Sequence, residues 1–330
     1  MSDDHKEKVL ITGANGFVGS RLCRKMIADG YRVIAGVREG CDATYLVDQD
    51  VEYRFGDITH PETLPGMVSG MDYIIHNAGV VKATRQALYY EVNQIGTRNL
   101  LNAVSAFNDL KKFILISSAA AAGPSKPDQP KTESMPAEPI TAYGRSKAAG
   151  EREILAVADK INSVIIRPPA IYGPGDKEMY AFFNIVNNRI IPYLGSLKRR
   201  IQLVHVDDLA AGVSAALRAQ TESGSIYFIG ENRSYSFSEL VKLLHGAVGR
   251  AGIPIYIPGW LVRMIAHLSE RTMRMFGKVP MFTVEKADEI LGDWEISIEK
   301  ARNDLGFESK IPFAEGALET TYWYREEGWL

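Results

Sequence analysis

Short apolar segments alternate along this chain with longer segments in which apolar residues recur every three or four positions. The expected strands occupy residues 8–12, 31–37, 51–55, 72–76, 112–116, 201–206 and 225–229. Such segments are typical of parallel strands buried on both faces, and the periodic segments between them are typical of amphipathic helices. The pattern predicts an α/β fold, a Rossmann-type doubly wound parallel sheet with a smaller, mostly α-helical substrate domain. We assign residues 1–168 and 201–230 to the sheet domain, and 169–200 and 231–330 to the substrate domain.

The first expected strand ends in a glycine-rich turn. Gly13, Gly16 and Gly19 follow Thr12 at regular intervals, and an amphipathic helix begins at the far side of the turn. Glycine lets backbone amides approach a pyrophosphate, and a helix N-terminus attracts its negative charge. The turn therefore predicts a dinucleotide site. The apolar stripe of the helix consists of Val18, Leu22, Met26 and Ile27.

Arg38 directly follows the second expected strand, where a dinucleotide fold contacts the adenosine ribose. An acidic residue at this place bonds the ribose hydroxyls of NAD, whereas an arginine suits the 2′-phosphate of NADP. Glu39 comes next and keeps the NAD reading open. We therefore expect NADP as the cofactor, with NAD as the alternative.

Polar side chains that could carry chemistry occur around the fifth strand and the helix after it. Ser118 follows the strand, and Tyr143 and Lys147 stand four residues apart, which places them on one face of the helix. Asn93 lies inside an expected helix at residues 87–107, where asparagine is unfavourable unless its side chain forms a hydrogen bond. These residues are the catalytic candidates.

A series of motifs covers the first 210 residues in order: TGANGFVG, GDIT, NAG, ISSA, YGRSK with Glu151, and RPPAIYGPG at residues 167–175. The series resembles the extended short-chain dehydrogenases/reductases, the NAD-dependent epimerase/dehydratase family. The resemblance implies that Tyr143 exchanges a proton with a carbonyl or alcohol oxygen, that Ser118 bonds this oxygen, and that Lys147 holds the nicotinamide ribose. It also gives Asn93 a structural or proton-relay role. The cofactor-binding residues that it implies are Thr12, Gly13, Asn15, Gly16, Phe17, Val18, Gly19, Arg38, Asp57, Ile58, Asn77, Ala78, Gly79, Tyr143, Lys147 and Pro168.

Acid–base work by Tyr143 sets an electrostatic requirement. A phenol has a pKa near 10, so service at neutral pH requires a drop of roughly 2 to 3 units. One ammonium about 4 Å away, at an effective dielectric constant of ~20, contributes roughly 4 kcal/mol. We therefore expect Lys147 to lower the pKa of Tyr143.

Departures from the family motifs narrow the reaction. A 4,6-dehydratase needs acidic residues directly after the catalytic hydroxyl, and this chain has Ala119 and Ala120 there. Nucleotide-sugar epimerases usually carry an arginine at the place of Ile201 and a second one shortly before the place of Asp293, and this chain has neither. The chain therefore resembles most the 3β-hydroxysteroid dehydrogenase and dihydroflavonol reductase branch.

The expected function is an NAD(P)H-dependent oxidoreductase that interconverts a ketone and a secondary alcohol on an apolar or aromatic small molecule. The segment at residues 260–276 is expected to line the apolar pocket, because an apolar stripe lies on one side of the helix expected there. The stripe consists of Trp260, Leu261, Met264, Ile265 and Leu268. A nucleotide-sugar epimerase is the alternative. A non-catalytic nucleotide sensor is a remote alternative, which the intact Ser118, Tyr143 and Lys147 disfavour.

Composition limits the partners. The 330 residues carry a formal net charge of −2 without a basic stripe, so nothing favours a nucleic acid partner. Cys23 and Cys41 form no metal-binding pattern, and no run approaches the roughly 18 apolar residues of a membrane span. We expect a cytoplasmic enzyme without a metal. The family resemblance also implies a homodimer that pairs the helices of Asn93 and Tyr143.

Overall fold

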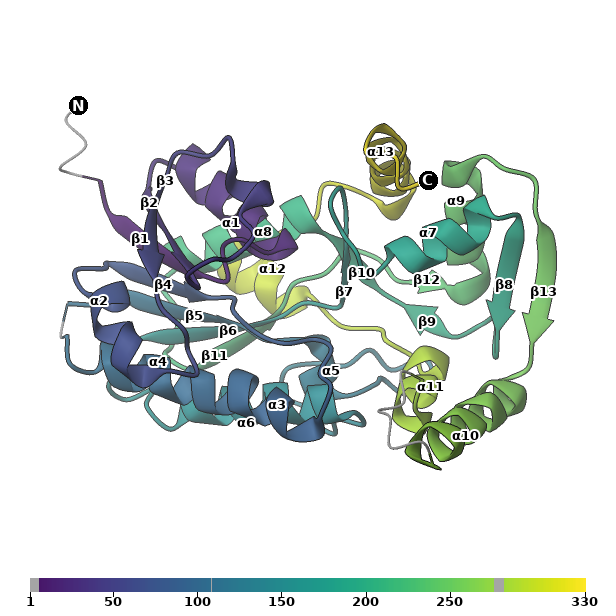
Figure 1. Ribbon diagram of the computed structural model, residues 1–330, viewed down its shortest axis with the longest axis horizontal. Coiled ribbons are helices and arrows are strands. Elements are labelled where there is room, and N and C mark those ends of the chain that lie inside the picture. Colours follow the sequence, from purple (N-terminus) through teal and green to yellow (C-terminus); the bar gives the residue numbers. More distant parts are fainter. Residues whose placement is uncertain (1–5, 108, 276–281) are drawn as a thin grey trace.

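A seven-stranded sheet forms the centre of the larger part of the molecule (Figure 1). The computed structural model describes residues 6–107, 109–275 and 282–330. The strand order is β11-β6-β5-β4-β1-β2-β3, and neighbouring strands are parallel. The order reverses between β1 and β4, where a doubly wound sheet opens a crevice at its carboxyl edge. The predicted fold class is confirmed. The strands are β1 Lys8–Thr12, β2 Arg32–Val37, β3 Val51–Phe55, β4 Tyr73–His76, β5 Lys112–Ile116, β6 Ser163–Arg167 and β11 Ser225–Phe228.

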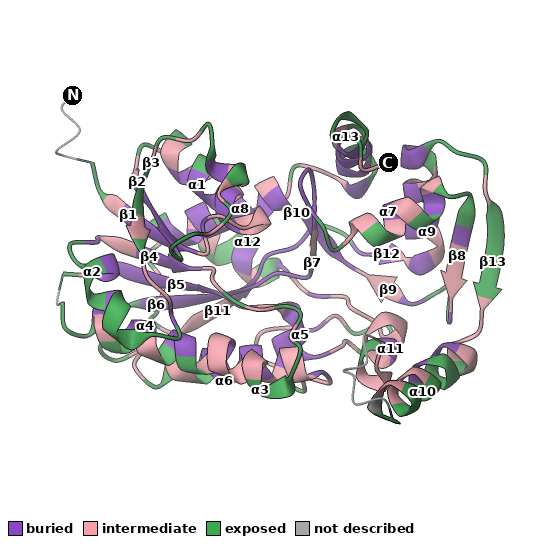
Figure 2. Cartoon of the chain, viewed as in Figure 1, coloured by how far each residue is buried: buried purple, intermediate pink, exposed green. Residues whose placement is uncertain are grey.

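Helices cover both faces of this sheet, and Figure 2 shows its central strands buried between them. One face packs against α1, α8 and α12, through residues such as Leu22 and Ala301. The other packs against α2, α4 and α6, through residues such as Met67 and Ile154. The helices are α1 Phe17–Ala28, α2 Leu64–Val68, α4 Thr97–Val104, α5 Ala119–Ala122, α6 Ala142–Leu155, α8 Val206–Arg218 and α12 Glu299–Leu305.

The smaller part of the molecule combines helices with short strand pairs. β7 pairs with β10 and β8 with β13 in parallel, whereas β9 pairs with β12 antiparallel. Its core combines aliphatic side chains with the aromatic rings of Tyr172, Phe183, Tyr235, Phe313 and Tyr324. The elements are β7 Ala170–Tyr172, α7 Tyr180–Asn187, β8 Ile190–Leu194, β9 Arg200–Ile201, β10 Leu203–His205, β12 Tyr235–Ser236, α9 Phe237–Val248, β13 Ile253–Ile257, α10 Gly259–Met275, α11 Val284–Leu291 and α13 Phe313–Glu326.

Two expected elements are divided in the structure. The expected helix at residues 87–107 consists of α3 Gln86–Tyr90, a π-helical turn at Glu91–Gly96 and α4. The expected strand at residues 201–206 breaks at Gln202, because β9 and β10 on either side of it pair with different strands. The side-chain amide of Gln202 instead bonds the backbone of two distant segments.

The chain returns to the large sheet near its end. α12 packs on α8 and β11, and Phe307 joins the same core as Ala301. The division into residues 1–168 with 201–230 and 169–200 with 231–330 stays a prediction. Elements of the second set, α12 and β7 among them, pack on or pair with elements of the first. Among the described helices, none is both long and apolar enough to cross a membrane.

Candidate active site

The turn after β1 forms a cradle of bare backbone at the start of α1. Gly13 has a φ of +65°, and a Cβ atom there would lie 2.9 Å from the Cα atom of Ala78. A Cβ atom at Gly19 would lie 2.1 Å from the carbonyl oxygen of Gly13. Gly16 is the N-cap of α1, and among the described residues no side chain caps this end of the helix. Its backbone N–H groups can therefore bind a phosphate, so the turn fits the pyrophosphate of a dinucleotide.

One large cavity runs from this turn along the carboxyl edge of the sheet into the smaller part, with a volume of about 1240 Å³. A pocket for a single drug-sized ligand measures about 300–1,000 Å³, so this cavity has room for a cofactor and a substrate. Gly19 and Lys147 lie beside the cavity rather than on its wall. The wall includes the other residues implied for cofactor binding: Thr12, Gly13, Asn15, Gly16, Phe17, Val18, Arg38, Asp57, Ile58, Asn77, Ala78, Gly79, Tyr143 and Pro168.

Arg38 lies at the end of the cavity formed by β2 and β3. Its side chain is exposed, and no carboxylate pairs with it among the described residues. It also borders a shallow pocket of about 600 Å³ together with His60. Asp57, on the same wall, accepts hydrogen bonds from the backbone N–H and the hydroxyl of Thr59, both at 2.8 Å. The charge of Arg38 interacts with that of Asp57, but the two form no ion pair among the described residues, so the guanidinium can bind an anion.

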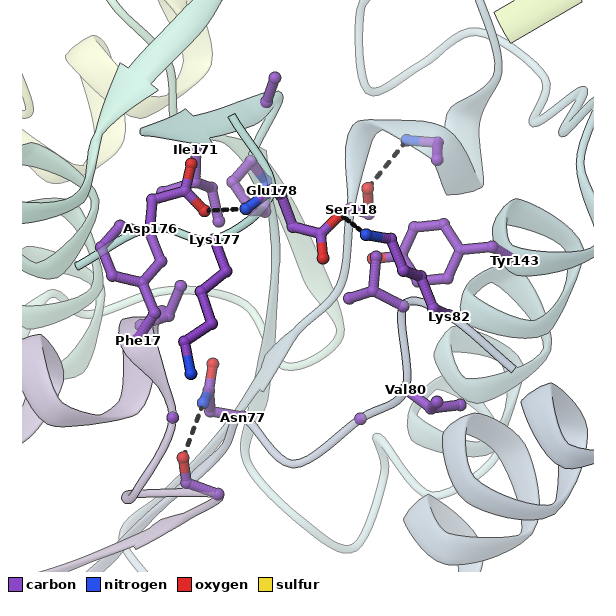
Figure 3. A pocket seen from close by; sticks show the side chains of 18 of the residues that line it. Phe17, Asn77, Val80, Lys82, Ser118, Tyr143, Ile171, Asp176, Lys177 and Glu178 are labelled. Carbon is purple, nitrogen blue, oxygen red and sulfur yellow. Dashed lines mark hydrogen bonds and ion pairs between the residues drawn. The ribbon is translucent and has the colours of Figure 1, made fainter. Parts of the chain in front are cut away.

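Tyr143 and Ser118 both line this cavity (Figure 3). Ser118 caps α5, and its hydroxyl oxygen accepts a hydrogen bond from the backbone N–H of Ala120 at 3.1 Å. Burial raises the pKa of Tyr143 to about 12, and a hydrogen bond with Ser118 opposes the rise. The expected lowering of this pKa was wrong, because the ammonium of Lys147 donates to the carbonyl oxygen of Ile116 at 2.6 Å and burial dominates. Tyr143 is a neutral phenol at physiological pH, which suits a proton donor.

A buried ion pair holds the helix that carries Lys147. Arg167, at the end of β6, donates two hydrogen bonds to Glu151 at 2.8 and 2.6 Å. The hydroxyl of Ser117 donates to the same carboxylate at 2.5 Å. Burial lowers the pKa of Lys147 to about 8, and Glu151, one turn further along α6, opposes the shift. The network therefore fixes α6 against β5 and β6 and leaves Lys147 titrating near physiological pH.

Asn93 is buried and organises the segment after β4. Its side-chain oxygen accepts a hydrogen bond from the backbone N–H of Val80 at 2.9 Å. Its amide group donates to the carbonyl oxygen of Val80 at 3.1 Å and to the hydroxyl of Ser146 at 2.9 Å. The π-helical turn around Asn93 also packs tightly, because a Cβ atom at Gly150 would lie 2.4 Å from the Asn93 carbonyl oxygen. These contacts support a positioning role for Asn93, which does not line the cavity itself.

A family model described as the NAD dependent epimerase/dehydratase family matches residues 9–230. The chain belongs to this family. The match spans nearly the whole seven-stranded sheet and the four catalytic candidates. The resemblance expected from the motifs is confirmed, and the protein is an NAD(P)-dependent enzyme of this family.

The named relatives in the epimerase/dehydratase family cover several activities. A ceramide reductase from Caulobacter vibrioides is 32% identical over 333 residues, which covers 100% of this chain and 98% of the relative. A 2-alkyl-3-oxoalkanoate reductase from Stenotrophomonas maltophilia is 26% identical, with 94% of this chain and 97% of the relative covered. A 3 beta-hydroxysteroid dehydrogenase/Delta 5→4-isomerase from Mycobacterium tuberculosis is also 26% identical, with 96% and 90% covered. The crystal structure of gox2253 matches with a TM-score of 0.85 and 26% identity, over 98% of this chain and 100% of that one.

The end of the cavity within the smaller part is apolar, and we call it the substrate arm. It lies between α7, α9, α11 and the segments around β7, β9 and β10. Its apolar wall consists of Ile171, Met179, Phe182, Ile201, Leu203, Phe237, Leu240, Val241, Leu244, Ile290, Trp294 and Phe313.

The described part of the segment expected to line the pocket, residues 260–275, does not line the cavity, so this expectation was wrong there. This part lies in α10, which packs on α11 through the small side chains of Val262 and Ala266. Trp260 and Leu268 are 65% and 62% exposed, and Figure 2 shows much of α10 exposed. The apolar stripe does lie on one side of α10, but it is the opposite side, with Val262 and Ala266, that packs against the rest of the protein. Phe276 lies outside the described residues.

Two charged features of the cavity were missed in the sequence. Lys82, after β4, and Glu178, before α7, form an ion pair of 2.8 Å that links the two parts of the molecule (Figure 3). Glu178 lies close enough to Tyr143 to help raise its pKa. Arg199 lines the substrate arm, whereas the neighbouring Arg200 bonds Ser234 outside the wall. The sequence did place Arg199 two residues before Ile201, a spacing that favours a common side of an extended chain.

Proposed function

We propose that the protein is an NADPH-dependent reductase that converts a ketone into a secondary alcohol on a predominantly apolar, long-chain molecule, acting as a cytoplasmic homodimer. The observation that carries this proposal is the continuity of one cavity from the glycine turn past Tyr143 into the substrate arm. An arm walled by leucine, isoleucine, valine and phenylalanine binds alkyl chains by burying them. The relatives named as reductases of ceramide and of 2-alkyl-3-oxoalkanoates, both molecules with alkyl chains, support the same substrate class.

The proposed chemistry divides among the residues at the centre of the cavity. When bound, the nicotinamide supplies the hydride. Tyr143 donates its phenolic proton to the carbonyl oxygen, and the phenolate then regains a proton from water. Ser118 bonds the same oxygen, and Lys147 binds the nicotinamide ribose. A pKa of about 12 favours this direction, because the phenol already carries the proton that reduction consumes.

The preference for NADPH over NADH rests on Arg38. Its exposed, unpaired guanidinium at the end of β2 can bind a 2′-phosphate through charge-assisted hydrogen bonds. The bare backbone of the turn serves either cofactor, so Arg38 is the residue that discriminates. NAD remains the alternative cofactor.

The homodimer would form through the outer surface of α3, α4 and α6. Asn93 cannot take part directly, because it is buried beneath that surface. Ile95 and Leu155 are 42% and 47% exposed on the same layer and would be covered on pairing. Light scattering at micromolar concentration tests the pairing, and a monomer would contradict it.

The test of the proposed function is NADPH oxidation with a panel of ketones. The panel contains aliphatic ketones of increasing chain length, a steroid ketone, a flavonoid ketone and UDP-glucose. We expect kcat/KM to rise about fourfold for each added methylene until the arm is full. Conversion of UDP-glucose to its epimer without reduction of any ketone would instead identify a nucleotide-sugar epimerase.

A further inference from the structure

Arg199 is a buried cation on the wall of the substrate arm, with only 3% of its surface exposed. The other lysines and arginines that line the described cavity are all exposed: Arg38, Lys82, Lys177 and Lys286. Burying a cation in an apolar wall is costly unless a partner compensates its charge. The position of Arg199 therefore requires an explanation that packing alone does not give.

One end of the Arg199 guanidinium is held by the protein. Nη1 donates hydrogen bonds to the carbonyl oxygens of Leu194 and Ser196, the latter at 2.9 Å. The guanidinium carbon lies 3.5 Å from the centre of the Phe237 ring, which supports it by a cation–π contact. Nε is buried and has no hydrogen-bond partner among the described residues. The Nε–Nη2 edge is thus left as a fork of donors, the geometry that matches a carboxylate or phosphate.

The described carboxylates of the protein do not fill this fork. Burial lowers the pKa of Arg199 to about 10, and Asp293 opposes the shift, so the side chain stays charged at neutral pH. Asp293 forms no ion pair with Arg199, and its Oδ1 accepts a hydrogen bond from the backbone N–H of Arg200 at 2.7 Å. A fixed, charged donor pair without an acceptor on the wall of a cavity indicates a binding site for an anionic group.

We propose that Arg199 binds an oxyanion of the substrate, a carboxylate or phosphate at the polar end of an otherwise apolar molecule. This inference rests on the proposed function and names the substrate class more closely. The apolar part of the molecule packs against Leu240, Val241 and Leu244 on the same wall. A nucleotide diphosphate fits less well, because Arg199 is a single buried cation and its neighbours on the wall include Ile201.

The test compares ketones of equal chain length that carry different polar end groups. Long-chain 3-oxo acids, their methyl esters and keto-alkyl phosphates of the same length are assayed with NADPH. We expect wild type to prefer the better anion over the ester by about 10- to 100-fold in kcat/KM. The larger preference, for carboxylate or for phosphate, identifies the source of the oxyanion. Arg199→Met should remove the preference, mainly through KM, because an anchor remote from the carbonyl binds ground and transition states alike.

Two variants separate this role from a structural one. Arg200→Met removes the adjacent arginine, which bonds Ser234 outside the cavity wall, and should keep the preference. Arg199→Lys keeps the charge but loses the fork, so a preference of about threefold to tenfold should remain. Thermal unfolding and NADPH affinity show whether each variant folds. If Arg199→Met does not fold, Arg199→Lys and wild type decide the question.

Calorimetry with a saturated long-chain acid and the matching alcohol tests the site without turnover. Tighter binding of the acid by wild type, lost in Arg199→Met and reduced in Arg199→Lys, supports the proposal even if no ketone is reduced, in which case only the proposed function fails. Equal kcat/KM for anion and ester in a wild type that reduces both overturns the role of Arg199 and leaves the proposed function standing. Binding of UDP through Arg199 without any response to the acids also overturns it.

Discussion

At the cofactor end of the cavity the wall is mostly backbone and small residues, whereas at the substrate end it is mostly large apolar side chains. The glycine turn leaves the first N–H groups of α1 without a side-chain cap among the described residues, and a side chain at Gly13 would collide with Ala78. The substrate arm instead presents residues such as Leu240 and Phe313. A backbone site can bind only a ligand of fixed geometry, such as a pyrophosphate. Where side chains form the wall, substitutions among them can change which ligand binds without disturbing the sheet.

The largest expected effect lies where the two ends meet. Tyr143→Phe removes the phenolic hydroxyl, which is the proton donor and the partner of Ser118, so kcat should fall by roughly 10²- to 10⁴-fold while NADPH affinity changes little. Steady-state assays and fluorescence titration measure the two quantities. Tyr89→Phe is the matched control, because its ring lies 6.2 Å from that of Tyr143 and its hydroxyl bonds the carbonyl oxygen of Val81. Activity of Tyr143→Phe within about threefold of wild type would refute the assignment.

The second prediction tests whether α9 or α10 contacts the substrate. Leu244→Gln places an amide in the substrate arm and should lower kcat/KM for a long-chain ketone by about 30-fold, because burying an unbonded polar group opposes apolar binding. NADPH affinity should not change. Leu268→Gln makes the same substitution on the exposed face of α10 and should leave kcat/KM within about twofold of wild type.

If Leu268→Gln lowered kcat/KM and Leu244→Gln did not, the substrate would contact α10 rather than α9. Thermal unfolding is needed for Leu244→Gln, because this side chain also belongs to the core of the smaller part. A variant that is unfolded at the assay temperature is replaced by Leu244→Ala, which opens space without adding a polar group.

The third prediction concerns the edge of the cofactor end. Arg38→Ala should reduce the ratio of NADH to NADPH dissociation constants by about tenfold, because a charge-assisted contact to the 2′-phosphate is lost. Arg32→Ala is the control, because Arg32 lies at the other end of β2 and does not line the cavity. Its guanidinium forms an ion pair with Glu52 at a distance of 2.8 Å. Unchanged selectivity in Arg38→Ala, or tighter binding of NADH than NADPH by wild type, would contradict NADP as the cofactor.

The same difference between the two ends explains what the sequence could predict. At the cofactor end, residues such as Gly13, Asn77 and Ser118 follow strands directly, so the parallel sheet places them together once the strands are identified. At the substrate end, Arg199, Leu240 and Phe313 come from segments whose contacts are not local in the sequence. A helical stripe shows that one side is apolar, but not what covers it. The stripe of α10 was therefore assigned to the cavity, whereas the stripe of α9 lines it.

The electrostatics of Tyr143 were also beyond the sequence. The four-residue spacing placed Lys147 on the same helix face as Tyr143, but spacing does not give the direction of the ammonium, which bonds the carbonyl oxygen of Ile116. Nor does it give the depth of burial that raises the pKa of the phenol. Lys82 and Glu178 lie far apart in the sequence, and only the fold brings them over the same cavity.

The smallest expected effect concerns Lys147, whose burial beside the cofactor end should lower the free energy of unfolding. The pKa of Lys147 is lowered from 10.5 to about 8. Between these two values the unfolded chain binds more protons than the folded protein, so this lysine makes the free energy of unfolding rise with pH, starting near pH 8. Against Lys147→Met, wild type should gain about 1 kcal/mol between pH 7 and 9. The methionine also leaves the Ile116 carbonyl oxygen without its partner, but that loss does not depend on pH.

Denaturant unfolding of both proteins at several pH values measures this difference. Lys242→Met, at an exposed lysine on α9, is the control, and its difference from wild type should stay constant over the same range. A constant difference for Lys147→Met as well would mean that the ammonium is not destabilised by burial. Burial of Lys147 would then have no cost in stability. The two ends of the cavity would differ only in that backbone forms the wall at one end and apolar side chains form it at the other. A rising difference would add a third element to the cofactor end, a buried charge that the fold holds in place through Glu151 and Arg167.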